Sequence, residues 1–285
     1  PVNKNLLSLY GLKWNPFTPD LPTEACRVTP RVEHFCQRVE NLARDGGFAL
    51  ATGEPGTGKS VALRILVSRL GALRDVTVGV LTRPQCTEAD FYRELGATFG
   101  VDLAPHNRWR CATLLRERWQ AHIEASLLRA VLVVDEAQQM RDSVFDELRL
   151  LTAAKLDAQS LLTVVLAGDL RLVERLRDPD LTSLASRIRV RLPLDVVPAA
   201  ELAEYLRHAT AAAGNPNLMT AELVSTLAEH AAGNLRLLMN LSAELLEAGA
   251  RKEVARLDEK LYLEVFSLPS PEAGRRRSPA GAGAR

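Results

Sequence analysis

The sequence predicts an α/β fold, in which a parallel sheet is sandwiched by helices and is followed by a small all-helical domain. Three observations predict it. Short apolar segments alternate with amphipathic segments along the first two thirds of the chain. The segments near Val131 and Thr163 are apolar throughout, which is typical of parallel strands buried on both faces. After Pro193 only helical patterns remain.

The first 30 residues are predicted to be an extended N-terminal segment, because their prolines oppose a helix. An α/β domain is expected over 31–195, beginning with a helix over 31–43. Its expected strands are 48–52, 76–81, 131–135, 163–167 and 188–192. Its further expected helices are 59–70, 88–99, 113–128 and 143–155, with a shorter pair over 170–186.

A helical domain is expected over 196–266, with helices at 199–213, 221–231, 235–248 and 257–265. Residues 267–285 are rich in Pro, Gly, Ala and Arg, which predicts a disordered basic tail. The run Arg275–Arg277 in this tail either is solvated or adds nonspecific attraction to a partner.

Composition excludes several classes of protein. The 285 residues carry a net charge of +1, which neither demands nor excludes a nucleic-acid partner. No apolar run approaches the roughly 20 residues that span a bilayer, and the first residues lack a signal-peptide pattern. The four cysteines and five histidines show no metal-binding spacing. We therefore expect a cytoplasmic protein with reduced cysteines and no membrane partner.

The loop between the first strand and the next helix fits the phosphate-binding pattern G-x-x-x-x-G-K-[ST]. Glycines let the backbone direct its N–H groups at phosphate oxygens, and the positive end of the following helix faces the same place. Lys59 is expected to reach the β- and γ-phosphates, and the Ser60 hydroxyl to ligate Mg²⁺. The residues expected to bind the nucleotide are Gly53, Glu54, Pro55, Gly56, Thr57, Gly58, Lys59 and Ser60.

Two acids, Asp135 and Glu136, end the apolar strand at 131–134. Ligands of open α/β sheets bind at this end of the strands. Asp135 is expected to hold Mg²⁺, and Glu136 to polarise the attacking water as a general base. The second acid favours hydrolysis over a nucleotide switch that does not turn over. The predicted activity is therefore that of an ATPase, with ATP and Mg²⁺ bound.

With these motifs, residues 8–250 resemble the AAA+ ATPases. The resemblance implies that Asp169, after the fourth strand, occupies the position of a polar sensor near the γ-phosphate, although its charge would repel phosphate. It implies that Arg187, before the fifth strand, is a finger that completes a neighbouring subunit's site. It implies that Arg236 contacts nucleotide from the helical lid, and that Thr82 restrains the catalytic acid.

The arginines have an alternative interpretation. Arg187, Arg189 and Arg191 alternate along a possible edge strand, where solvated charges would protect the edge from pairing. If Arg187 is a finger, the protein is a homo-oligomer, in the form of a ring or a helical filament.

The opening Tyr10–Phe17 and the stretch 135–138 resemble the ExeA/TniB-type group of AAA+ ATPases. The resemblance implies that Asn15 and Phe17 pack on the adenine, unless they form a plain packing turn. It further implies a regulator that oligomerises on duplex DNA, selects a target and recruits a transposase or other recombination protein. The alternatives are an ExeA-like ATPase of a secretion system, acting with a separate membrane partner, and a scaffold without turnover.

In DNA-encircling relatives, the insert between the second and third strands lines the channel. Here that insert spans 83–129, where seven arginines stand against six acids. Nonspecific phosphate contacts are expected from the start of the helix over 113–128 and from nearby arginines. The residues concerned are Arg93, Arg108, Arg110 and Thr113. The alternative is a solvated loop with Trp109 in the core.

Overall fold

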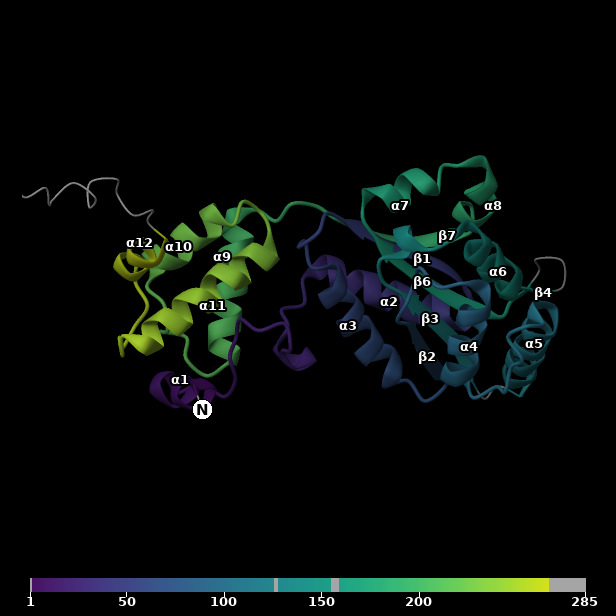
Figure 1. The fold of residues 1–285 in the computed structure, drawn as a ribbon, viewed down its shortest axis with the longest axis horizontal. Coiled ribbons are helices and arrows are strands. Elements are labelled where there is room, and N and C mark those ends of the chain that lie inside the picture. The colour runs from purple at the N-terminus through teal and green to yellow at the C-terminus, as the bar shows by residue number, and fades with distance from the viewer. Residues whose placement is uncertain (1, 126–127, 155–158, 267–285) are drawn as a thin grey trace, which may run out of the picture.

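A computed structural model describes residues 2–125, 128–154 and 159–266 (Figure 1). The expected tail, 267–285, lies outside these ranges. The central sheet has five strands in the order β2-β3-β6-β1-β7, and each neighbouring pair is parallel. The strands are β1 Gly47–Gly53, β2 Val76–Leu81, β3 Arg129–Val134, β6 Leu162–Gly168 and β7 Ile188–Leu194. The predicted α/β fold is confirmed.

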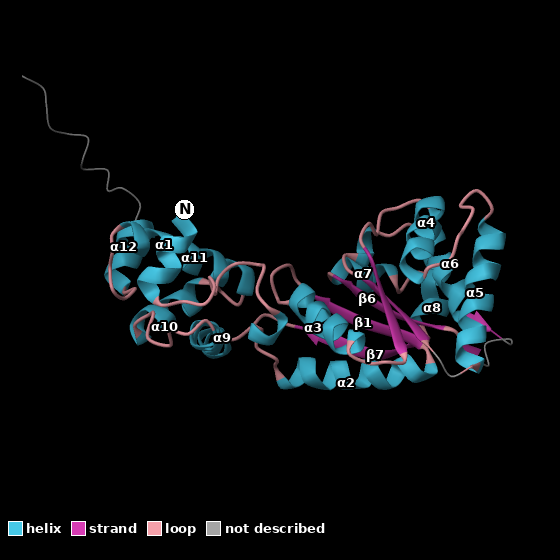
Figure 2. Cartoon of the chain, turned by 90° about the horizontal axis from the view of Figure 1, so that it is seen from below, coloured by secondary structure: helices cyan, strands magenta, loops and turns pink. Residues whose placement is uncertain are grey.

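Helices cover both faces of the sheet (Figure 2). Alternate side chains of β1 explain why: Phe48 and Leu50 enter one hydrophobic cluster, and Ala49 and Ala51 enter another. The Ala49 face is covered by α2 Pro30–Asp45 and α3 Lys59–Gly71. The opposite face is covered by α4 Glu88–Phe99, α5 Arg108–Glu124, α6 Asp142–Thr152, α7 Leu170–Arg175 and α8 Thr182–Ala185.

The second half of the fold is a helical lid with its own core (Figure 1). It contains α9 Ala199–Ala212, α10 Ala221–His230, α11 Leu235–Arg251 and α12 Glu259–Phe266. Short elements elsewhere are the 3₁₀ turns η1 Thr23–Ala25, η2 Ala137–Gln139 and η3 Pro179–Leu181, and the hairpin of β4 Ala153–Ala154 with β5 Gln159–Ser160. Among the described helices, none has the length and apolarity to cross a bilayer.

The N-terminal segment differs from its prediction. Residues Val2–Tyr10 form a helix, α1, so the expectation of an extended chain over 1–30 is wrong for them. No proline lies between Pro1 and Pro16, and Leu6 and Tyr10, one turn apart, are buried in the lid core. Asn215 Nδ2 donates to the Tyr10 carbonyl at 2.9 Å. The lid is therefore built from two distant parts of the chain, which Figure 1 shows side by side.

The start of α5 also differs from its prediction. The helix begins at Arg108, five residues before the expected start at 113, because Asn107 caps it: its Oδ1 accepts from the Arg110 N–H at 3.0 Å. Thr113 therefore lies in the second turn, where its hydroxyl donates to the Trp109 carbonyl at 2.9 Å. This placement removes the helix terminus on which the expected phosphate contact of Thr113 depended.

Candidate nucleotide site

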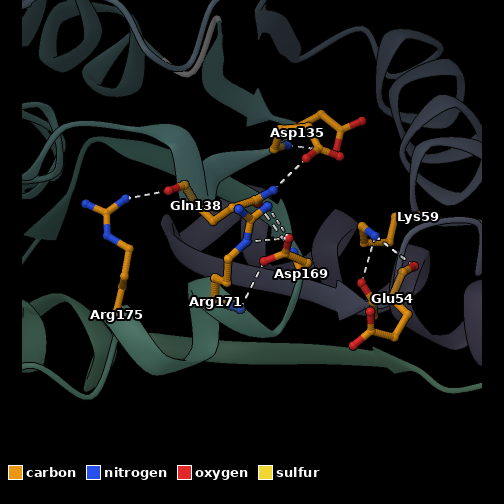
Figure 3. Close-up of polar contacts among 9 residues, drawn as sticks. Glu54, Lys59, Asp135, Gln138, Asp169, Arg171 and Arg175 are labelled. Carbon is orange, nitrogen blue, oxygen red and sulfur yellow. Dashed lines mark hydrogen bonds and ion pairs between the residues drawn. The ribbon is translucent and has the colours of Figure 1, made fainter.

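The phosphate-binding loop joins β1 to α3 at the carboxyl end of the sheet (Figure 3). Gly56 and Gly58 have φ of +90° and +99°, in the left-handed region that favours glycine. Lys59 is only 6% exposed, and its ammonium donates to the carbonyls of Gly53 and Glu54 at 2.7 and 3.0 Å. The loop thus curls around the lysine that is expected to contact phosphates.

Ser60 and Asp135 meet across two strands. The Ser60 hydroxyl donates to Asp135 Oδ2 at 2.8 Å, although the residues are 75 positions apart. The meeting follows from topology, because β1 and β3 flank β6 and end at the same edge of the sheet. A hydroxyl and a carboxylate are oxygen ligands that Mg²⁺ accepts. The two residues predicted as metal ligands therefore fit that ion.

Glu136 lies beside a glutamine that the sequence analysis missed. The backbone of Glu136 is left-handed at φ 53°, which is uncommon for residues other than glycine. Gln138 Nε2 donates to Glu136 Oε2 at 2.5 Å, and Gln138 Oε1 accepts from the Asp169 N–H at 3.4 Å. Thr82, the expected restraint of Glu136, instead donates to Glu94 at 2.7 Å. The partner of Glu136 therefore comes from its own loop rather than from β2.

Asp169 does not present a bare charge. Its carboxylate caps α7 by accepting from the Arg171 N–H at 2.9 Å and pairs with the Arg171 guanidinium at 2.6 Å. These hydrogen bonds hold the pKa of Asp169 below its usual range, and the charge of nearby Lys59 adds to the effect. Arg171 was missed because it follows the motif by two residues. Its positive charge offsets the repulsion of phosphate that was expected from Asp169.

The lid touches the phosphate-binding loop directly. The Leu235 N–H donates to the Gly56 carbonyl at 2.9 Å, and Asn234 Nδ2 donates to the Pro55 carbonyl at 3.2 Å. Arg236 follows in the first turn of α11, with an exposed side chain. The structure therefore brings Arg236 to the end of the lid that faces the loop, as expected of a residue that contacts nucleotide from the lid.

The Asn-Pro-Phe turn packs inside the lid. Asn15 Oδ1 accepts from the Phe17 N–H at 3.0 Å, and the Phe17 ring is 3% exposed among lid side chains. These contacts fit the alternative of a packing turn. A contact of Asn15 or Phe17 with adenine stays a prediction.

Arg187 lies at the amino end of the parallel strands, whereas the phosphate-binding loop lies at their carboxyl end. It directly precedes β7, an edge strand whose Ile188 pairs with Phe48 and whose Leu194 pairs with Gly53. Gly53 follows Phe48 by five positions, and at about 3.3 Å per residue the strand between them spans about 17 Å. Arg187 is therefore distant from the loop of its own chain.

The predicted DNA-contacting arginines are exposed, and two have acidic neighbours. Arg93 pairs with Asp90, and Arg108 lies 3.6 Å from Glu147. Arg110 is exposed beside Trp109, whose side chain is 80% exposed. The alternative that placed Trp109 in the core is wrong, because the earlier start of α5 sets this residue in a solvent-facing first turn.

The fold is that of AAA+ P-loop ATPases, and the site has residues suited to hold ATP with Mg²⁺. Comparison with known proteins agrees: residues 42–176 match the AAA domain family. The chain is 34% identical over 216 residues to general secretion pathway protein A of Aeromonas hydrophila, a match that covers 74% of this chain and 38% of that protein. The chain thus spans well under half the length of this relative.

Solved structures show the same fold at low sequence identity. Cdc6p from Pyrobaculum aerophilum superposes with a TM-score of 0.69 at 17% identity, over 89% of this chain and 72% of that one. The Aeropyrum pernix ORC1 protein, solved in complex with DNA, gives 0.60 at 22% identity, over 87% and 67%. The chain therefore contains an AAA domain with the fold of P-loop ATPases.

Proposed function

We propose that this protein is a homo-oligomeric regulator in which each ATP is hydrolysed between two copies of the chain. The observation that supports this most directly is the position of Arg187. It stands roughly one strand length from its own phosphate-binding loop, at an edge strand that faces outward. An arginine finger at this position serves a neighbouring copy.

The chain's own residues divide the work of hydrolysis. Lys59 and the loop N–H groups hold the phosphates, and Ser60 and Asp135 hold Mg²⁺, which when bound neutralises phosphate charge. Glu136 accepts a proton from the attacking water. Arg236 contacts the nucleotide from the lid, so that the bound nucleotide touches both the α/β domain and the lid.

A mixing experiment tests the shared site. Arg187→Ala should lose most turnover, since fingers contribute about 10³–10⁵ in rate, whereas Lys59→Ala should lose nucleotide binding. A mixture of the two should regain activity, because a Lys59→Ala copy still supplies Arg187 to its neighbour. Arg191→Ala, an exposed arginine of the same strand, is the control and should retain turnover. An inactive mixture contradicts a finger acting between copies.

For the partner, the named relative supports one candidate role. That protein belongs to a secretion pathway by name and is 34% identical to this chain. By this likeness, the protein is an ATPase of a secretion or membrane system that acts with a separate membrane partner. This role is supported if duplex DNA changes neither the rate of ATP hydrolysis nor the size of the protein's assemblies.

The second candidate role is selection of target DNA and recruitment of a transposase, for which the support is the exposed Arg110 and Trp109 on the β2–β3 insert. ATPase rate and sedimentation with and without duplex DNA, at low and moderate salt, test it. DNA-dependent assemblies that weaken steeply with salt are expected, because phosphate contacts release counterions. Arg110→Ala should weaken them and Arg251→Ala, an exposed lid arginine, should not. Assembly without any response to DNA rejects this role.

A further inference from the structure

Gln138 lies between Glu136 and Asp169 in the site. The residue is 8% exposed, and its side chain makes two hydrogen bonds, one to the carboxylate of Glu136 and one with the backbone N–H of Asp169. These partners follow different strands: Glu136 comes after β3, and Asp169 comes after β6. A single amide therefore connects the expected base to the neighbouring strand.

The two partners specify which way the amide points. A carboxylate accepts and a backbone N–H donates, so Nε2 must face Glu136 and Oε1 must face Asp169. A reversed amide would set oxygen against oxygen and N–H against N–H. Glutamate at this position would bring a second negative charge to Glu136, and an apolar side chain would satisfy neither partner. The pair of contacts thus selects glutamine by chemistry as well as by size.

The surroundings hold Gln138 in place. Arg175 Nη1 donates to the Gln138 carbonyl at 2.7 Å, and the same guanidinium pairs with Asp142. On the other side, a Cβ added to Gly168 would lie 2.5 Å from Gln138 Oε1, so the strand end leaves only enough room for glycine. The side chain is therefore fixed from its backbone and from the strand that it contacts.

Glu136 needs such a contact. Its side chain is exposed, and its left-handed backbone begins the short turn η2. An exposed carboxylate on a turn samples several rotamers, and a displacement of about 1 Å from the productive position can cost about 10²-fold in rate. Gln138 is the buried group that restricts Glu136, and it does so from the strand end that carries Asp169 and Arg171.

We propose that Gln138 is the positioning residue of this ATPase, orienting Glu136 by fixing its carboxylate to the backbone at the end of β6. The proposal rests on the proposed role of Glu136 as the general base. In this role Gln138 also connects Glu136 to the Asp169–Arg171 pair, so that a phosphate contact with Arg171 alters the position of Glu136.

Variants of Gln138 test the proposal in the full chain with Mg²⁺ and ATP. Gln138→Ala should lower kcat by about 10- to 100-fold, a part of the 10²–10⁴-fold that a general base supplies. Affinity for a fluorescent ADP analogue should stay within about twofold, because Gln138 lies outside the phosphate-binding loop. Gln139→Ala, the exposed neighbouring glutamine, is the matched control and should leave kcat unchanged.

A double mutant separates positioning from a purely structural role. In a Glu136→Gln background, Gln138→Ala should change the remaining rate by less than about twofold, because no base is left to orient. Hydrogen exchange supplies a readout without turnover: the Asp169 amide loses its partner and should exchange at least about tenfold faster. If Gln138→Ala does not fold, Gln138→Met, which keeps the length of the side chain, takes its place.

The outcomes are distinct. A normal kcat in Gln138→Ala, with Glu136→Gln slow, overturns this inference alone and leaves the proposed function standing. An equal loss in the Glu136→Gln background also overturns it, because the residue then acts through the fold. Equal turnover in the unmodified protein and in Glu136→Gln overturns the role of Glu136 and this inference together.

Discussion

Replacing Gly56 by alanine should weaken the contact between the lid and the phosphate-binding loop. The residue has a φ of +90°, where a side chain costs about 1–2 kcal/mol. Its new Cβ would also lie 2.2 Å from Asn234 Oδ1, so Asn234 must move. That movement weakens or breaks the hydrogen bonds from Asn234 to Pro55 and from Leu235 to Gly56, each of which contributes about 0.5–1.5 kcal/mol to stability. The expected loss of stability is about 2–5 kcal/mol.

Urea unfolding followed by circular dichroism measures this loss. Gly71→Ala is the control, because Gly71 is exposed at the end of α3 and a Cβ there meets nothing within 4 Å. It should stabilise the protein by about 0.5–1 kcal/mol. In an Asn234→Ala background the clash is gone, so Gly56→Ala should cost only the backbone strain of about 1–2 kcal/mol. Equal stability of Gly56→Ala and Gly71→Ala would refute the reasoning.

Three further predictions concern ionisation and exposure. The hydrogen bond from Arg69 at 2.6 Å holds the pKa of Glu33 below its ordinary 4.5. The pair therefore stabilises the fold fully above pH 4.5, and this stabilisation is lost as the pH falls through the lowered pKa of Glu33. Arg69→Met should therefore lose less stability than the unmodified protein between about pH 6 and pH 3, measured by urea unfolding; equal losses contradict the pairing. Burial raises the pKa of the Cys36 thiol to about 11, so a thiol reagent at about pH 8 should modify it only after unfolding, and rapid modification of the native protein argues against this core. Trp109 is 80% exposed, Trp14 is half-buried and Trp119 is only 4% exposed, so Trp109→Phe should remove most of the fluorescence that iodide quenches. Unchanged quenching would place the Trp109 ring in the protein interior.

The sheet and the phosphate-binding loop were predictable because their patterns are local. The strands other than β7 are short, mostly apolar segments, and β7 alternates apolar residues with arginines. The loop's glycines, Lys59 and Ser60 stand within eight consecutive residues. The edge position of β7 came from the resemblance to AAA+ ATPases, and the structure agrees. Residue type and spacing along the chain thus carried the fold class and the core of the site.

The missed features depend on contacts between distant segments or on weak local patterns. Gln138 gained its meaning only from Asp169, which lies 31 residues away. α1 was missed because the proline-rich residues after it dominated the interpretation of the whole segment, while its apolar face packs on a lid about 200 residues later. α5 begins five residues before the predicted start at 113 because a single residue, Asn107, caps the helix there.

Because the N-terminal helix and the Asn-Pro-Phe turn pack in the lid, two covalent connections join the lid to the sheet, over residues 18–29 and 195–198. Arg31 and Asp195, 3.4 Å apart, join the ends of these connections at one place. Two connections restrain the position of the lid relative to the sheet more than a single connection would. Arg64, on the helix that begins at Lys59, also donates to the Pro19 carbonyl at 2.8 Å within the first connection. A displacement of the first connection therefore either carries the helix that begins at Lys59 with it or breaks this hydrogen bond.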